Sequence, residues 1–164
     1  MTQPQRDKPM STGRHRLSVA GYWGVVAIWM LVISTLSGEP FSAQNTNQYI
    51  DPVLRYFFPQ FSLHELLMAH TVIRKAAHLT EFFILGLLTY WASRRGRQPR
   101  WQIGWMLQSL TLATCYALLD EAHQMFVRDR TASLADSGID TLGAALSQLV
   151  IYLRHRIGSR RRQA

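Results

Sequence analysis

The chain contains 20 consecutive residues, 17–36, without a single charged side chain. A helix needs about 20 apolar residues to cross a hydrocarbon core of roughly 30 Å, and such a helix satisfies its own backbone polar groups. The segment is longer than the apolar region of a typical signal peptide, and bulky Phe41 stands in the FSAQ sequence where a cleavage site needs a small residue. We therefore predict a retained signal anchor that spans a membrane.

Three further apolar segments follow, separated by strongly polar sequence: residues 76–92, 101–119 and 139–153. The second span carries only His78 and Glu81, the third carries no charge, and the fourth reaches spanning length if its helix begins near Asp136. A mean hydropathy of −0.05 hides this alternation. The single cysteine, Cys115, excludes an intrachain disulfide and is expected to be buried. The pattern predicts an all-α membrane protein with about four transmembrane helices over residues 17–153.

The basic residues are concentrated on one side of these spans. The tail 1–16, the loop between the second and third spans and the arginine-rich tail 154–164 hold 13 of the 18 basic residues and one acid. The other side holds five basic residues and nine acids, so the net charges are +12 and −4. Because Lys and Arg near spans are preferentially retained in the cytoplasm, both termini are predicted to be cytoplasmic. There the basic tails are expected to attract anionic lipid headgroups, with no nucleic acid as a partner.

The external segment between the first two spans has helical patterning of its own. Apolar residues recur at helical spacing at Ile50, Val53, Leu54, Phe57 and Phe58. This spacing predicts a short amphipathic helix that lies along the membrane surface.

A capping box follows this segment. Ser62 and Glu65 have the spacing at which a serine and a glutamate satisfy the first turn of a helix. We expect that helix to continue through His70 into the second span.

Ionisable and polar residues coincide with membrane depth at three helix ends, all on the predicted external side. Placing such a residue at this depth costs free energy, so it is retained where it is ion-paired or serves a function. Ser34 and Ser37 close the first span at the same level, and small Gly143 and Ser147 continue the fourth span's polar stripe and allow close helix approach. The predicted polar cluster consists of Lys75, His78, Glu81, Asp120, Glu121, Gln124, Asp136 and Asp140, with Arg130 in the adjoining loop.

These residues resemble the VanZ-like family of small bacterial membrane proteins. The matching pattern is Lys75-x-x-His78-x-x-Glu81-Phe82, then Asp120-Glu121-x-x-Gln124-x-Phe126, then Arg130, Asp136, Asp140 and Gly143. It extends over about residues 29–150, and Asp140 and Ser147 stand where the family's last motif has Asn and a second Gly. The resemblance implies a multi-pass protein of the bacterial plasma (inner) membrane, related to one associated with resistance to the glycopeptide teicoplanin. It implies no defined reaction.

The chemistry of the cluster has several interpretations. A histidine beside paired carboxylates can supply a general acid and base, which makes His78, Glu81, Asp120 and Glu121 the catalytic candidates. Because basic groups can hold phosphate, the candidates for binding a substrate are Lys75, Gln124, Arg130, Asp136 and Asp140. Alternatively, Glu81 and Asp120 neutralise Lys75, Arg74 or Arg130 in ion pairs that lock the helices together. The donors would also suffice for a divalent ion, but no diagnostic ligand spacing is present, so no metal or cofactor is assigned.

The favoured hypothesis is an envelope protein whose external site binds a lipid headgroup, a cell-wall precursor or a glycopeptide and contributes to glycopeptide resistance. The first alternative is an enzyme acting on a lipid-linked phosphate or glycan in the outer leaflet. The second is an ion or proton pathway, which the charge-free middle of the first and third spans disfavours.

Overall fold

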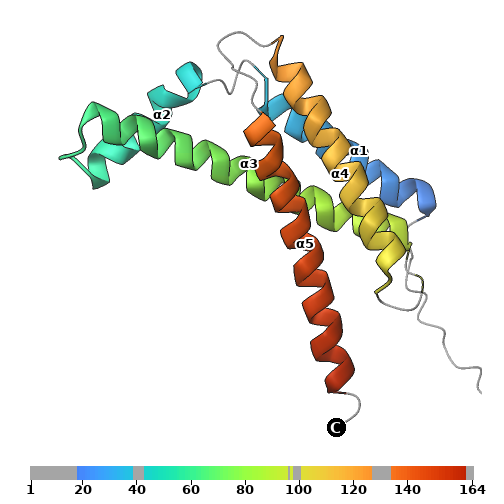
Figure 1. Cartoon of the computed structure of the whole chain (residues 1–164). Coiled ribbons are helices and arrows are strands. Elements are labelled where there is room, and N and C mark those ends of the chain that lie inside the picture. The colour runs from blue at the N-terminus through green and yellow to red at the C-terminus, as the bar shows by residue number, and fades with distance from the viewer. Residues whose placement is uncertain (1–17, 39–42, 96, 98–100, 127–133, 162–164) are drawn as a thin grey trace, which may run out of the picture.

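The computed structural model describes residues 18–38, 43–95, 97, 101–126 and 134–161. Within these ranges the chain forms helices and no strands, which confirms the all-α prediction (Figure 1). The helices are α1 (Val19–Leu36), α2 (Ala43–Phe57), α3 (Leu63–Arg94), α4 (Ile103–Gln124) and α5 (Leu134–Arg160). The tail 1–16 and Arg130 lie outside the described residues.

Each apolar segment of the sequence forms a helix or the inner part of one. Among the described residues, α1 alone is both long and apolar enough to cross a membrane by length and composition. The helices α3, α4 and α5 have 32, 22 and 27 residues, so they reach spanning length, but polar side chains lower their hydropathy. The last helix also continues to Arg160, into the segment predicted as a separate arginine-rich tail.

The start of α3 follows from the capping box. The Ser62 hydroxyl accepts a hydrogen bond from the Glu65 backbone N–H at 3.3 Å, and the Glu65 carboxylate accepts one from the Ser62 backbone N–H at 2.7 Å. Both bonds satisfy donors that a helix start leaves open. As predicted, the helix then runs without interruption through His70 to Arg94.

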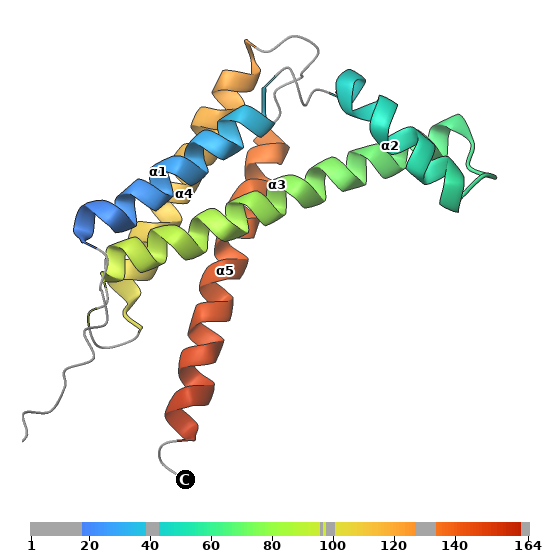
Figure 2. The same cartoon turned by 180° about the vertical axis from the view of Figure 1, so that it is seen from behind.

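The amphipathic helix predicted between the first two apolar segments is confirmed as α2. It lies beside the first half of α3, away from α1 and α4 (Figures 1 and 2), and Asp51 contacts the imidazole of His70. Its outer face is apolar, with Val53 55% and Phe57 66% exposed. The helix ends at Phe57, so Phe58 of the predicted face follows it.

The helix α3 is the centre of the packing. It contacts α1, α2, α4 and α5, most extensively α5. A Cβ added at Gly143 would overlap the carbonyl oxygen of Leu79, and one added at Gly86 would overlap the hydroxyl of Ser147. The small residues on α5 therefore allow the close approach that the sequence predicts. The buried apolar core around this crossing includes Ile33, Phe82, Leu85, Ala117 and Ala144.

A layer of neutral polar groups lies deeper between the helices. The carbonyl oxygen of Gly86 accepts hydrogen bonds from the Ser109 hydroxyl at 2.9 Å and from the Gln148 amide at 3.0 Å. These bonds join α3, α4 and α5. On the opposite side of α4, Cys115 is exposed, so the expectation that it is buried was wrong: it lies on the helix face that turns away from the core.

Candidate functional site

The predicted polar residues converge where α1 and α4 end and α5 begins, against the middle of α3 (Figures 1 and 2). Asp120 lies in the last two turns of α4, Asp140 in the second turn of α5, and His78 on the facing side of α3. Ser37 caps the C-terminal end of α1 at the same level. Four segments that are far apart in the sequence thus contribute to one cluster.

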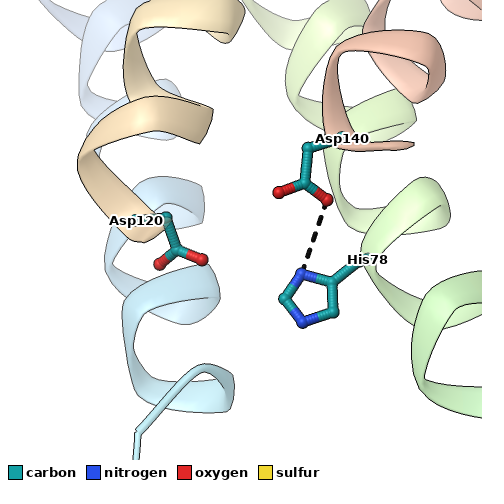
Figure 3. A group of neighbouring side chains, drawn as sticks. All are labelled: His78, Asp120 and Asp140. Atoms are coloured by element: carbon teal, nitrogen blue, oxygen red, sulfur yellow. Dashed lines mark ion pairs between the residues drawn. The ribbon is translucent and has the colours of Figure 1, made fainter. Parts of the chain in front are cut away.

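His78, Asp120 and Asp140 form the centre of this cluster (Figure 3). The imidazole Nδ1 of His78 lies 3.5 Å from an oxygen of Asp140. One possible ligand atom from each of the three residues lies within 4.8 Å of the other two, and both aspartates are buried. We refer to these three residues as the His–Asp–Asp triad.

Hydrogen bonds hold Asp120 by one of its two oxygens. Its Oδ2 accepts a bond of 2.8 Å from the Ser37 hydroxyl and one of 2.9 Å from the side-chain amide of Gln124. The other oxygen, Oδ1, is buried and accepts no hydrogen bond from the described residues. The neutral partners therefore fix the orientation of the carboxylate without neutralising its charge.

Lys75 and Asp136 form the outer edge of the site. The Lys75 ammonium lies 3.7 Å from an Asp136 oxygen, and the side chains are 44% and 31% exposed. The two contacts Lys75–Asp136 and His78–Asp140 are successive along α3 and α5, one helical turn apart. Lys75 thus forms its ion pair with Asp136, a pairing that the ion-pair interpretation did not include, and the hydrogen bonds that the described residues donate to Asp120 come from neutral groups.

The remaining candidates lie around the triad. Glu121 is buried and Glu81 is half-buried, and neither belongs to the group of mutually close ligand atoms. The backbone carbonyl of Glu81 accepts a 3.0 Å hydrogen bond from the Trp29 indole, which fixes this turn of α3 against α1. Arg130 lies outside the described residues, so its predicted place over the cluster stays a prediction.

The sequence reasoning missed the neutral polar layer of Ser109 and Gln148. The available signal was that Ser109 and Gln148 are among the uncharged polar residues of two predominantly apolar segments, 101–119 and 139–153. Ser37 was placed at the correct level, but its bond to Asp120 depends on how α1 docks against α4 and has no local pattern.

Taken together, the long helices, the apolar α1 and the buried polar cluster at the helix ends define a class: helical proteins with an internal polar site. The model of the VanZ/LLP1 family matches residues 22–155, and the chain belongs to this family. The matched range contains every residue of the cluster, which confirms the resemblance seen in the sequence. No curated protein and no solved structure gave a significant match.

Proposed function

We propose that the protein spans the bacterial plasma membrane four times, with both termini in the cytoplasm. Support comes from the outward faces of the helices, where large apolar side chains are well exposed, including Ile28, Leu31 and Leu119 at 65–67%. Such faces are unfavourable in water and favourable in lipid. Several of the polar side chains that lower the hydropathy of α3, α4 and α5 are instead buried between the helices, among them Ser109, Asp120, Asp140 and Gln148. The +12 and −4 division of charge then orients the polar cluster to the outside.

We further propose that this external site binds the phosphate-bearing headgroup of a lipid or lipid-linked cell-wall precursor. The observation that carries the proposal is that two buried carboxylates and a partly buried histidine, contributed by three helices, lie close together where α4 ends and α5 begins. Ionisable groups at such depth are characteristic of functional sites. Lys75, nearly half exposed at the edge, is positioned to contact an incoming phosphate, with Arg130 as a second basic group.

We propose that such binding is how the protein contributes to glycopeptide resistance. Sequestering or covering an envelope precursor changes the access of teicoplanin to its target. No reaction is required for this effect. The proposed role in resistance is based on the membership of the chain in the VanZ/LLP1 family.

An enzymatic role on the same headgroup is the second candidate, and the contact between His78 and Asp140 favours it. A carboxylate beside an imidazole orients the ring and stabilises its protonated form, as a general acid or base requires. The neutral layer of Ser109 and Gln148 beneath the triad disfavours a proton pathway, because neither side chain titrates.

The test is to identify the lipid that co-purifies with the full-length protein in mild detergent. Mass spectrometry should find a phospholipid or undecaprenyl phosphate species enriched over the bulk membrane extract, and the enrichment should be lost in Lys75→Gln and Asp140→Asn. Asp51→Asn is the matched control, since Asp51 contacts His70 outside the cluster. A folded wild-type protein without any enriched phosphate-bearing lipid contradicts the proposal, as does equal enrichment in the cluster variants.

A further inference from the structure

The His–Asp–Asp triad has the composition and arrangement of a metal-ligand set. Figure 3 shows its three side chains pointing toward one space from α3, α4 and α5. Imidazole nitrogen and carboxylate oxygen are common ligands of divalent transition metals. The sequence has no diagnostic ligand spacing because each ligand comes from a different helix.

A second observation concerns the hydrogen bonding of the buried oxygens. Asp140 is 1% exposed, and neither of its carboxylate oxygens accepts a hydrogen bond from the described residues. Asp120 is 3% exposed, and its Oδ1 is likewise without a donor there. Buried carboxylate oxygens are normally hydrogen-bonded or bound to a cation, because removing them from water is costly.

The basic side chains of the described residues do not supply the missing positive charge. Lys75 pairs with Asp136 at the edge, and no described Lys or Arg forms an ion pair with Asp120 or Asp140. A protonated His78 contributes one charge against two carboxylates. A divalent ion balances both carboxylates with His78 neutral, which is the form in which histidine binds metals.

From these observations we infer that His78, Asp120 and Asp140 bind one divalent metal ion of the Zn²⁺ or Mn²⁺ type. Nothing in the sequence assigns such a site, and it goes beyond the proposed binding of a headgroup. The ligand set of one nitrogen and two oxygens favours these ions over Mg²⁺ and Ca²⁺, which prefer oxygen ligands alone.

The geometry requires little adjustment. Metal–ligand bonds of about 2.1 Å in tetrahedral geometry place neighbouring ligand atoms about 3.4 Å apart. His78 Nδ1 and Asp140 Oδ1 are already 3.5 Å apart. One ligand atom of each residue lies within 4.8 Å of those of the other two, so no pair of these atoms has to close by more than about 1.4 Å to reach this spacing.

Ser37 and Gln124 act as positioning residues for the ion. By donating to Oδ2 of Asp120, they leave Oδ1, which accepts no hydrogen bond from the described residues, available as a ligand. Hydrogen bonds to metal ligands typically tune affinity by about 10- to 100-fold.

Three protein ligands also leave a coordination position open for water or a phosphate oxygen. On this point the inference rests on the proposed function: the ion supplies the positive charge that lets an acidic site bind a phosphate headgroup. The ion binding itself can be measured without any lipid.

The experiment titrates Zn²⁺, and separately Mn²⁺, into full-length protein in detergent after removal of metal with a chelator. Calorimetry, together with elemental analysis after desalting, should give about one ion per chain. Ser37→Ala should lower the affinity by about 10- to 100-fold, and His78→Gln, Asp120→Asn and Asp140→Asn should each lower it further. The matched controls are His70→Gln and Asp51→Asn, which alter another histidine–aspartate contact of the same chain. Both should bind the ion as the wild type does.

A spectroscopic measurement keeps the test decisive if a triad variant does not fold. Co²⁺ bound to the wild-type protein should give the visible d–d bands of a site with nitrogen and oxygen ligands, and Zn²⁺ should displace them. Less than a tenth of an equivalent bound to the wild type, or unchanged affinity in the three triad variants, overturns the inference. Ion binding without lipid enrichment refutes the proposed function alone, and lipid enrichment without ion binding refutes the metal site alone.

Discussion

The close approach of α5 to α3 makes Gly143 the most informative position to perturb. A Cβ there would overlap the carbonyl oxygen of Leu79 and lie 3.2 Å from the Cα of that residue. These are helix backbone atoms and have no rotamer that clears the space. Since carbon atoms pack at about 3.5–4.0 Å, the contact with this Cα alone requires the two helices to separate by about 0.3–0.8 Å in Gly143→Ala.

The expected size of the effect follows from two opposing contributions. Alanine favours a helix over glycine by about 1 kcal/mol. Forcing an extra methyl group into a close-packed contact costs about 1–3 kcal/mol. Gly143→Ala should therefore lower the free energy of unfolding by about 0–2 kcal/mol.

Gly138→Ala is the matched control on the same helix. A Cβ at Gly138 meets nothing within 4 Å, so this variant gains the helix preference without the overlap. It should be more stable than the wild type by about 1 kcal/mol. The difference between the two alanine variants, about 1–3 kcal/mol, isolates the cost of the helix contact.

The assay is reversible unfolding in mixed micelles with increasing sodium dodecyl sulfate, followed by tryptophan fluorescence. A second readout is Zn²⁺ affinity, because Leu79 adjoins His78 and Gly143 lies one turn after Asp140. Separating the helices should lengthen the 3.5 Å contact between His78 and Asp140 and weaken ion binding in Gly143→Ala alone. If the two variants are equally stable to within about 0.5 kcal/mol, the close contact does not exist and the reasoning fails.

Three further predictions test other parts of the structure. In a Cys115→Ala background, a cysteine at Asn45 should react with an impermeant thiol reagent added to intact cells and one at Gly96 should not; labelling at Gly96 would reverse the orientation. Hydrogen bonds from the cap of α3 lower the pKa of Glu65 below its ordinary value of 4.5. The ionised Glu65 carboxylate therefore stabilises the folded protein above pH 4.5, and this stabilisation is lost as the pH falls through the lower pKa of the folded state. Glu65→Gln should remove this part of the loss of stability in acid. An acid unfolding profile that is unchanged in the variant would contradict the capping role. Replacing the bridging amide in Gln148→Leu should reduce stability in detergent by about 0.6–2 kcal/mol without changing ion affinity, and a parallel loss of both would show that the neutral layer and the triad are not separate.

Local sequence patterns determined the helices. The capping box of Ser62 and Glu65 gave the start of α3, and the apolar spacing around Val53 gave α2, because capping and amphipathicity act within a few turns of one chain. The sequence also identified the ionisable residues of the site, since a charge inside an apolar segment stands out against its neighbours. The helix α5 continues beyond residue 153, where the arginine-rich tail was predicted to begin, because arginine is a good helix former.

The tertiary structure decided which of these side chains contact one another. The spacing of His78 and Glu81 is compatible with either of them facing Asp140, and Lys75 could have paired with any of several acids. Periodicity defines the faces of a helix, but the rotation and crossing of packed helices decide which faces touch. Here the contacts of α5 at Gly143 and Ser147 fix that crossing and bring Asp140 to His78. The docking of α1 then brings Ser37 to Asp120, and the same packing turns Cys115 outward.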